Sequence, residues 1–407
     1  MRVLLIGNGG REHAIGWKLV QSPRVKELIS LPGNPGLAEL GPVVEGIATT
    51  DAGAIAAMAR IQNVDLVVVG PEAPLAAGVV DAVSRLGIPV FGPTRSAARL
   101  ESSKTFAKQI MERAGVPTGG HRVFTDPADA KAHIDSTDGP YVVKADILAA
   151  GKGVLVTDSR SEAAAWVDRW IERAPVLIEE FLDGSELSVF SVCTDRGAVP
   201  LQPARDYKRL LDGDQGPNTG SMGSYSPVDD LPEDLVERVM TEVVEPTLGQ
   251  METDGHPFRG FLYAGLALTK QGPKVIEFNV RLGDTEAQAV LPRLSSDIVD
   301  LLEGGQPEWS DTATVCVAIA SAGYPEEPET GAVITGLDKV PSDVLVLHAG
   351  TALNDAGKVV SSGGRVLNLV GMAATVAEAR DRAYAGVAAV DWPGKQFRTD
   401  IALNLET

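Results

Sequence analysis

The sequence predicts an α/β fold that starts with a doubly wound parallel sheet and continues into α+β and β-rich domains. Short apolar runs at 3–6 and 66–69 alternate with amphipathic segments, and the first run ends in a glycine turn. Such alternation is typical of βαβ units. After Tyr324 the chain again favours short strands, which indicates a separate small β-rich domain.

The first hundred residues contain the βαβ units. The strand at 3–6 precedes a helix at about 12–20. The strand at 66–69 precedes one helix over 75–86, in which apolar residues recur at helical spacing, and then a strand at 88–91. These elements form the N-terminal sheet domain.

The middle of the chain predicts a domain connection and then a small α+β subdomain. A helix at 101–114 stops at Gly115. A helix at 161–173 follows among three strands, which lie at 142–143, 154–156 and 176–178. The stretch 200–227 is rich in Gly, Pro, Asp, Ser and Asn and too long for a simple turn, so we expect a functional or mobile loop.

The last third begins with a hairpin and ends with a helix. Apolar runs at 261–268 and 274–278 predict the hairpin. A capping box of Thr375 and Glu378 predicts the start of the last helix. The elements divide into a Rossmann-like substrate domain at 1–100, a second domain at 101–322 with a mobile lid subdomain at about 120–188, and a β-rich domain at 323–407.

Composition limits the classes of function. Of 407 residues, 44% are hydrophobic and 22% charged, which suits about two to four packed domains. The net charge of −19 opposes non-specific attraction to nucleic acid or anionic lipid, so we expect small-molecule substrates and neither nucleic acid nor membrane as partner. Cys193 and Cys316 lie in apolar runs and are expected to be buried. Without a signal peptide or a long apolar run, we expect a cytoplasmic monomer.

A glycine turn at 7–10 follows the first strand and opens a helix, so its N–H groups could hold a phosphate. A dinucleotide site would need a third glycine where Glu12 stands, and an acid at the end of the next strand, which has Leu31-Pro32-Gly33. A tight turn without a ligand is the alternative. Glu72 follows the strand at 66–69 at the same sheet edge, where its carboxylate could accept sugar hydroxyls or only cap a helix.

Two lysines flank a glycine loop in the predicted subdomain. Lys144 ends a strand, and Lys152 precedes Gly153 and a further strand, so the loop is no Walker A motif, which continues into a helix. Ammonium groups placed in this way suit the binding of a polyphosphate. The alternative is an ordinary surface hairpin without a ligand. After the strand at 176–178, the run 179–182 (EEFL) offers an apolar slot for a flat base and carboxylates for ribose hydroxyls.

A carboxylate and an amide lie two residues apart in the second strand of the hairpin. Glu277 and Asn279 therefore project from the same face, and such oxygen ligands suit Mg²⁺. Arg281 and Asp284 follow, and a guanidinium can grip a carboxylate or a phosphate with two hydrogen bonds. A polar outer strand face is the alternative for this segment.

In this order the motifs resemble those of the ATP-grasp ligases, and among them the phosphoribosylamine-glycine ligases, also called glycinamide ribonucleotide synthetases. The motifs are GNGGREHA at 7–14, GPEAPLAAGVVD at 70–81, FGPT at 91–94, LAAGKGV at 148–154, EEFLDG at 179–184, GPNTG at 216–220, FLYAGL at 261–266 and KVIEFN at 274–279. The resemblance implies a biotin-carboxylase-like N-terminal domain and an ATP-grasp domain pair. It also implies ligation of glycine to 5-phosphoribosylamine through glycyl phosphate, the second step of purine biosynthesis, with ATP as co-substrate and Mg²⁺ or Mn²⁺ as cofactor.

The resemblance also implies roles for individual residues. It assigns ATP binding to Lys104, Lys144, Gly151, Lys152, Gly153, Glu179, Glu180, Phe181, Leu182 and Glu186. It assigns the sugar phosphate and glycine to Gly9, Gly10, Glu72, Asp206, Lys208, Arg209 and Arg281. It assigns catalysis to Arg281, Asp284, Lys152 and Asp206, and the metal to Glu277 and Asn279.

Three places depart from the family's pattern: Ile147 and Ser221 each replace a glycine, and Leu282 with Thr285 alters the run around Arg281. A β-branched residue reaches positive φ only at a cost, so we expect altered loop mobility with the same chemistry. Two alternatives stay open beside the ligase, apart from the weakened oxidoreductase hypothesis. One is a relative that acts on another acid and amine, and the other binds a nucleotide without catalysis.

Overall fold

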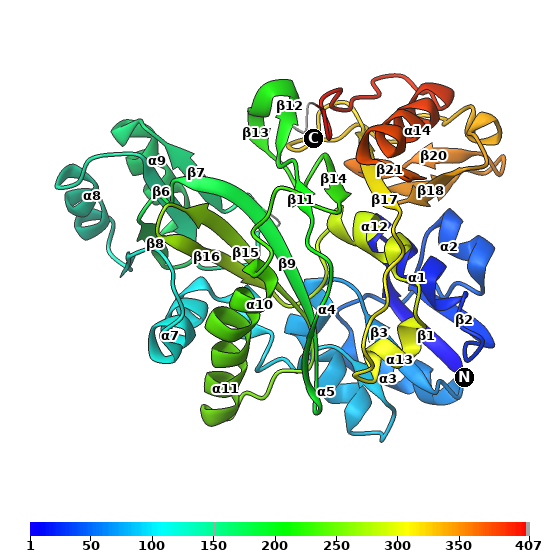
Figure 1. Ribbon diagram of the computed structural model, residues 1–407, viewed down its shortest axis with the longest axis horizontal. Coiled ribbons are helices and arrows are strands. Elements are labelled where there is room, and N and C mark those ends of the chain that lie inside the picture. The colour runs from blue at the N-terminus through cyan, green and yellow to red at the C-terminus, as the bar shows by residue number, and fades with distance from the viewer. Residues whose placement is uncertain (150–151, 404–407) are drawn as a thin grey trace.

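The computed structural model describes residues 1–149 and 152–403, and its N-terminal sheet is parallel with strand order β2-β1-β3-β4. The four strands are β1 (Arg2–Gly7), β2 (Glu27–Pro32), β3 (Leu66–Val69) and β4 (Val90–Phe91). The helices that accompany them are α1 (Gly10–Leu19), α2 (Pro35–Leu40), α3 (Ala52–Ile61), α4 (Glu72–Ala77) and α5 (Val79–Ser84). The predicted doubly wound parallel sheet is therefore confirmed (Figure 1).

Two helices predicted as continuous are each divided in two. The helix expected over 75–86 breaks between α4 and α5 because Gly78 has φ +87°, a left-handed conformation that ends a helix. The helix expected over 101–114 divides into α6 (Arg99–Ser102) and α7 (Lys104–Ala114). Ser103 starts α7 because its side chain accepts a hydrogen bond from the N–H of Phe106. Gly115, with φ +68°, ends α7 as predicted.

A small antiparallel sheet of order β5-β8-β6-β7 forms the lid subdomain, which projects to the left in Figure 1. Its elements are β5 (His121–Phe124), α8 (Pro127–Asp135), β6 (Tyr141–Ala145), β7 (Val154–Thr157), α9 (Arg160–Trp170) and β8 (Val176–Glu179). The two helices and the sheet enclose a separate apolar core that includes Val143, Val167, Trp170 and Ile178. The subdomain thus has packing of its own.

The largest antiparallel ladder joins β9 to β15 in a sheet of order β10-β9-β15-β16. Its strands are β9 (Gly184–Thr194), β10 (Gly197–Pro200), β15 (Gly260–Thr269) and β16 (Gly272–Asn279). Helices α10 (Leu235–Val239) and α11 (Glu245–Thr253), with the π-helical turn η2 (Met240–Val244) between them, lie beside it with α7. The predicted hairpin of β15 and β16 is confirmed.

The stretch 200–227 is not the structureless loop expected from its composition. It contains β11 (Arg205–Asp206), β12 (Arg209–Leu211), η1 (Asp212–Asp214), β13 (Gln215–Asn218) and β14 (Gly223–Ser226). Strands β12 and β13 form a hairpin, whereas β11 and β14 join the C-terminal sheet. Pairing with a strand distant in sequence satisfies the hydrogen-bonding groups of the backbone in this polar segment. The local sequence pattern gives no indication of such pairing.

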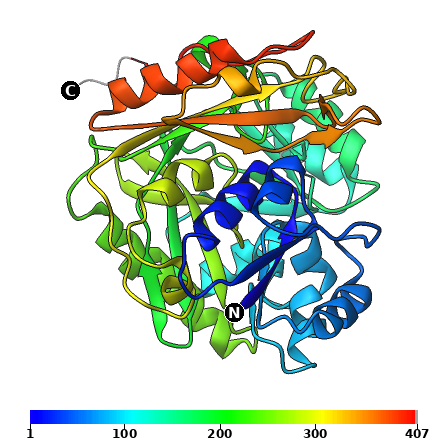
Figure 2. The same ribbon diagram turned by 90° about the vertical axis from the view of Figure 1, so that its right-hand side faces the viewer.

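The C-terminal domain is a five-stranded antiparallel sheet of order β11-β14-β17-β21-β18 (Figure 2). Its remaining elements are β17 (Ala313–Ala320), η4 (Leu337–Lys339), β18 (Val344–His348), β19 (Thr351–Leu353), β20 (Val359–Ser361), β21 (Arg365–Ala373) and α14 (Val376–Ala389). The connection from β16 holds α12 (Glu286–Val290), η3 (Leu291–Arg293) and α13 (Ile298–Leu302). The side chain of Thr375 caps α14 as predicted, by accepting a hydrogen bond from Glu378 N.

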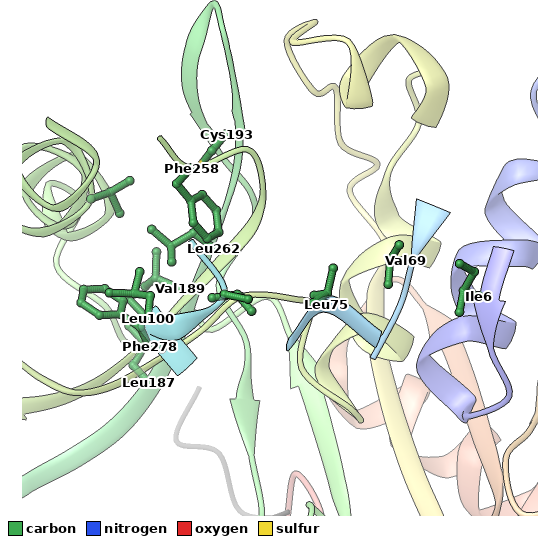
Figure 3. Close-up of a cluster of buried hydrophobic side chains, with 14 of the residues drawn as sticks. Ile6, Val69, Leu75, Leu100, Leu187, Val189, Cys193, Phe258, Leu262 and Phe278 are labelled. Carbon is green, nitrogen blue, oxygen red and sulfur yellow. The ribbon is translucent and has the colours of Figure 1, made fainter. Parts of the chain in front are cut away.

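One cluster of buried apolar side chains connects the N-terminal sheet to the central antiparallel sheet (Figure 3). It runs from Ile6 and Val69 through Leu75 to Leu262 and Phe278. Both cysteines are free and buried, as expected from their apolar surroundings, and burial raises the pKa of Cys193 to about 12. Within residues 1–149 and 152–403, no helix is long and apolar enough to cross a membrane.

Candidate active site

A cavity of about 390 Å³ lies where the lid subdomain, the central sheet, the N-terminal domain and the C-terminal domain meet. Its walls include Lys144 from the lid, Glu277 from β16, Glu72 from α4 and Arg365 from β21. Most of the predicted site residues lie in these walls, although they are spread over more than 200 residues of sequence. The cavity is therefore the candidate active site.

A buried carboxylate holds two lysines on the lid side of the cavity. One Glu179 oxygen lies 3.0 Å from the Lys144 ammonium and 3.1 Å from that of Lys108. Lys144 also donates to the carbonyl of Ile276 at 3.0 Å. Burial by itself raises the pKa of Glu179, but the two ammonium groups outweigh it and hold that pKa below its usual range. Glu179 is thus ionised at neutral pH, and two lysines with one carboxylate leave one net positive charge here.

Lys108 was missed from the sequence, although its spacing from Lys104 gives a signal. Residues four apart lie on the same face of a helix, and both lysines line the cavity from α7. Lys104 donates to the carbonyl of Ile147 at 3.1 Å. Burial lowers the pKa of Lys104, while the nearby Glu277 carboxylate acts in the opposite direction. The cavity therefore has three lysines on this side.

The loop that follows β6 lies only partly within the described residues. Gly153 lines the cavity, whereas Lys152 is exposed and lies outside its lining, and Gly151 falls among the residues that the structure does not describe. Ile147 also lines the cavity and packs against the lid core. Its φ is not positive, so the strain expected from replacing a glycine at this position does not arise.

The segment after β8 forms an apolar end of the cavity. Phe181 and Leu182 line it together with side chains from α7, the lid and β16. The apolar lining residues around them include Ala107, Met111, Val142, Val156, Ile276 and Phe278. Glu180 is an exposed lining residue that accepts a hydrogen bond from Gly120 N at 3.0 Å. Apolar side chains of this kind suit a flat apolar group.

Glu277 and Asn279 lie on β16 opposite Gly265 and Tyr263, and both line the cavity as predicted. Burial raises the pKa of Glu277, but Lys208, Lys144 and Lys104 outweigh it and lower that pKa overall. In the described part of the chain, neither side chain has a hydrogen-bond or ion-pair partner within the protein. An ionised carboxylate beside an amide oxygen, both facing the cavity, fits a hard divalent cation.

The described residues contain no group of three or more His, Cys, Asp and Glu side chains close enough to form a metal site by themselves. A cation at Glu277 and Asn279 would therefore take its remaining ligands from water or from a phosphate. Mg²⁺ is commonly bound in this way in nucleotide sites.

Arg281 is the centre of an ion-pair network that reaches the N-terminal domain. Its guanidinium lies 2.9 Å from Glu101 and 3.4 Å from Glu72, and Arg11 lies 3.9 Å from Glu72. Glu101 also accepts a hydrogen bond from Val280 N at 2.8 Å. Glu101 and Arg11 were missed because their sequence context, a helix start and a glycine turn, points to no partner.

Asp206 and Lys208 lie in the cavity wall beside further carboxylates, and Lys208 pairs with Glu186. Burial raises the pKa of Asp206 to about 7. The carboxylates of Glu286 and Glu186 also raise this pKa, whereas the ammonium group of Lys208 lowers it. Ser188 donates to Tyr263 at 2.9 Å and contacts Glu286 at 3.4 Å. Glu286 was missed because only the fold turns the first residue of α12 toward the cavity.

Asp284 is held by two side chains, one distant in sequence and one four residues away. Arg365, from the C-terminal domain, lies 3.1 Å from its carboxylate, and Gln288 donates to the same carboxylate at 2.6 Å. Burial raises the pKa of Asp284, but the charges of Arg365 and Arg11 lower it overall. Arg365 had no sequence signal, because it lies in a β-rich segment without a motif.

Besides Lys152, three predicted residues that the structure describes are not among those that line the cavity. The N–H of Gly9 donates to the Glu12 carboxylate at 2.8 Å, and Gly10 is buried against Asn368. Arg209 donates to the carbonyl of Gly216 within its own hairpin at 2.9 Å. The Glu12 side chain fills the glycine turn, since a Cβ built at Gly7 or Gly70 would lie 2.3 or 2.4 Å from its Cγ. These glycines thus make room for Glu12, although Gly9 still borders the site near Asp284.

Two antiparallel sheets that enclose a lysine-lined cavity, with a carboxylate and an amide on one strand beneath it, define a protein of the ATP-grasp class. A solved structure from outside the ligases supports the fold alone. It is the biotin carboxylase domain of Hydrogenobacter thermophilus 2-oxoglutarate carboxylase, with 16% identity and a TM-score of 0.72, covering 97% of this chain and 91% of that one.

Similarity to known proteins narrows the class. The chain matches the three domains of phosphoribosylglycinamide synthetase: the N domain over residues 1–101, the ATP-grasp (A) domain over 102–287 and the C domain over 314–404. Phosphoribosylamine-glycine ligases from Streptomyces coelicolor and Leifsonia xyli are 50% and 48% identical, each with 99% of both chains covered. The crystal structure of the Thermotoga maritima ligase has a TM-score of 0.86 and 37% identity, covering 98% of this chain and all of that one. The chain belongs to the phosphoribosylamine-glycine ligase family.

Proposed function

We propose that the chain joins glycine to 5-phosphoribosylamine with ATP, giving glycinamide ribonucleotide, ADP and phosphate. The relatives at 48–50% identity are named for this ligation. The observation that carries the proposal is that one cavity combines a lysine-lined lid, the Glu277–Asn279 pair and the Arg281 network. The monomeric state and cytoplasmic location predicted from the sequence belong to this proposal as well.

The lid side of the cavity would bind ATP. Phe181 and Leu182 provide apolar surface for the base, and the exposed main chain after β8 can read its edge. Lys104 and Lys144 offset the charge of the phosphates. Lys108 acts through Glu179, because it shares that carboxylate with Lys144. Lys152, exposed on the loop after β6, would contact the phosphates only if the lid closes.

Glu277 and Asn279 would hold Mg²⁺ or Mn²⁺. The bound cation would offset the charge of the phosphoryl group during its transfer. Glu277 is ready for this role because its pKa is lowered, which keeps the carboxylate ionised at neutral pH.

The remaining residues would position the acid and the amine. A carboxylate oxygen is a poor leaving group, so phosphorylation of glycine gives an acyl phosphate whose carbonyl the sugar amine can attack. The new C–N bond forms as the C–O bond to phosphate breaks, and the amine loses a proton. Arg281 can hold a carboxylate or a phosphate, and Asp206, with a pKa of about 7, can accept a proton at neutral pH.

The sugar phosphate would bind toward the N-terminal domain. Arg11, Arg281 and Arg365 supply positive charge there, and Glu72 is near for a ribose hydroxyl. The predicted role of Arg209 in placing glycine remains part of this proposal, with one guanidinium nitrogen donating to the carbonyl of Gly216 in the β12–β13 hairpin.

The test is ADP release by the purified protein with Mg²⁺ and ATP. Four mixtures are compared: glycine alone, phosphoribosylamine alone, both together, and both with Glu277→Gln. The proposal requires ADP only with both substrates, and a loss of at least about 100-fold in the variant, the scale on which one electrostatic group at a reaction centre acts. ADP release that needs neither substrate would indicate another acid and amine, and ATP binding without ADP release would indicate a non-catalytic relative.

A further inference from the structure

Two of the residues that depart from the family's pattern contact each other beside the cavity. The hydroxyl oxygens of Ser221 and Thr285 lie 3.0 Å apart. Both side chains are buried, at 1% and 0% exposure, so neither can reach a substrate. Any effect of this pair on the reaction must therefore act through the segments that carry it.

Ser221 adopts a backbone conformation that favours glycine. Its φ is +108°, which costs free energy in any residue with a Cβ. Its side chain is fully engaged in return: the hydroxyl donates to the carbonyl of Gly223 at 3.0 Å and accepts from the N–H of Gly223 at 3.3 Å. The hydroxyl of Thr285 completes these contacts, and either of the two hydroxyls can be the donor between the side chains.

The two residues belong to two segments of the cavity wall. We call residues 218–222 the glycine segment and residues 281–286 the arginine segment. Gly220 of the first and Asp284 of the second both line the cavity, next to Ser221 and Thr285. Ser224 adds a second buried bond between the same regions, since it donates to the carbonyl of Thr285 at 2.9 Å.

Two side chains of the C-terminal domain also bond to the glycine and arginine segments. Arg365 donates to the carbonyls of Gly220 and Ser221 at 2.8 and 3.1 Å and pairs with the Asp284 carboxylate at 3.1 Å. The hydroxyl of Tyr324 accepts from the N–H of Gly220 at 3.0 Å. The two segments are thus fixed from the C-terminal domain by Arg365 and from within by the hydroxyl pair.

We infer that the Ser221–Thr285 hydroxyl pair is a positioning device that locks the glycine segment onto the arginine segment and so sets the places of Gly220 and Asp284 in the cavity wall. This inference rests on the proposed function for its kinetic consequences. The locked segments face the arginine-rich part of the cavity, whereas the apolar part is built from Phe181, Leu182 and the lid. The pair should therefore affect glycine or phosphoribosylamine and leave ATP largely unaffected.

The kinetic test compares Thr285→Val, which removes only the hydroxyl, with Thr285→Ser, which keeps it. A buried hydrogen bond contributes on the scale of about a 3- to 10-fold change in an equilibrium. Thr285→Val should raise the KM of at least one of the two non-nucleotide substrates by that factor, with the KM for ATP within about 2-fold, and Thr285→Ser should restore the wild-type value. Equal KM values for the two variants would overturn the inference.

Ser221 variants separate the hydrogen bond from the backbone strain. Ser221→Ala removes the hydroxyl and keeps a Cβ at positive φ, whereas Ser221→Gly removes both. If the hydroxyl acts as inferred, both variants raise the same KM as Thr285→Val, and Ser221→Gly is the more stable of the two to heat. The double variant Ser221→Ala/Thr285→Val should be no worse than Ser221→Ala alone, because Ser221→Ala already removes the bond that Thr285→Val breaks. Additive effects on KM would contradict this.

A matched control variant and a second measurement separate the inferred role from a general effect of losing a buried hydroxyl. Ser361→Ala also removes a buried hydroxyl, one that accepts from Ala332 N at 3.1 Å outside the cavity lining, and should leave every KM unchanged. Amide hydrogen exchange of residues 218–222, measured without substrates, should be faster in Thr285→Val than in Thr285→Ser. This comparison decides the inference even if the wild-type protein makes no glycinamide ribonucleotide, and equal exchange rates would reject the lock.

Discussion

The buried ion triad of Glu179, Lys108 and Lys144 gives the sharpest test of how the lid side of the cavity is held. Glu179→Gln keeps the volume of the side chain and removes its charge. Both ammonium groups keep their neutral partners, Thr118 Oγ1 at 2.9 Å for Lys108 and the Ile276 carbonyl at 3.0 Å for Lys144. The variant therefore leaves two buried like charges without their shared counterion.

The expected loss of stability follows from this burial. Removing one partner of a buried ion pair costs about 3–5 kcal/mol, because an uncompensated charge stays in the interior. The Glu179 side chain is only 5% exposed and contacts two lysines that are 3% and 4% exposed, so solvent screens the triad very little. About 2–4 °C in Tm per kcal/mol is usual for domains of 150–250 residues, so the transition of the unit that contains the lid should fall by about 6–20 °C.

Calorimetry checks this value, and the neighbouring residue supplies the control. Glu180→Gln makes the same chemical change one residue further on, where the side chain is 52% exposed and lies 3.8 Å from Lys274. We expect this control to stay within about 0.5 kcal/mol of wild type. The double variant Lys108→Met/Glu179→Gln should recover much of the lost stability. It removes one ammonium group together with the carboxylate, so the net charge of the cluster returns to the wild-type value of +1. Equal transitions for Glu179→Gln and Glu180→Gln would refute the reasoning.

The pH dependence gives the sign of the same effect. The pKa of Glu179 is lowered in the folded protein, so the carboxylate contributes stability above its unfolded pKa and loses it as the pH falls through the folded pKa. The difference in stability between wild type and Glu179→Gln should stay constant from about pH 7 to pH 5 and shrink below about pH 4. A difference that grows on acidification would contradict the ion-triad account.

Three further predictions concern other parts of the protein. Burial raises the pKa of Asp206 to about 7, so wild type should lose stability relative to Asp206→Asn as the pH rises from about 4 to 7, in thermal scans across that range. Ile147→Gly should raise the KM for ATP several-fold through lost packing on the lid core, and unchanged kinetics would contradict this. Arg398 is 1% exposed and pairs with Asp214 and Asp400 at 2.7 Å, so Arg398→Met should speed proteolysis within the β12–β13 hairpin, whereas unchanged cleavage would exclude this role.

The sequence by itself determined every feature that depends on neighbours along the chain. Short apolar runs between amphipathic segments predicted the parallel sheet, and two apolar runs joined by a short turn predicted the β15–β16 hairpin. Side chains also alternate strictly along a strand. The same alternation placed Glu277 and Asn279 on one face of β16. The order of the motifs was enough to indicate the family, since each motif is a local run of residues with a fixed local task.

The tertiary structure alone decided which distant groups meet. Glu101 with Arg281 and Arg365 with Asp284 are pairs separated by 80 or more positions, and no spacing rule connects them. Only packing could show that Glu12 fills the glycine turn or that Ser221 and Thr285, two unrelated departures in the sequence, form one hydrogen bond. The physical reason is that local pattern fixes the direction of a side chain within its element, whereas burial, pKa and ion pairing depend on how elements pack against one another.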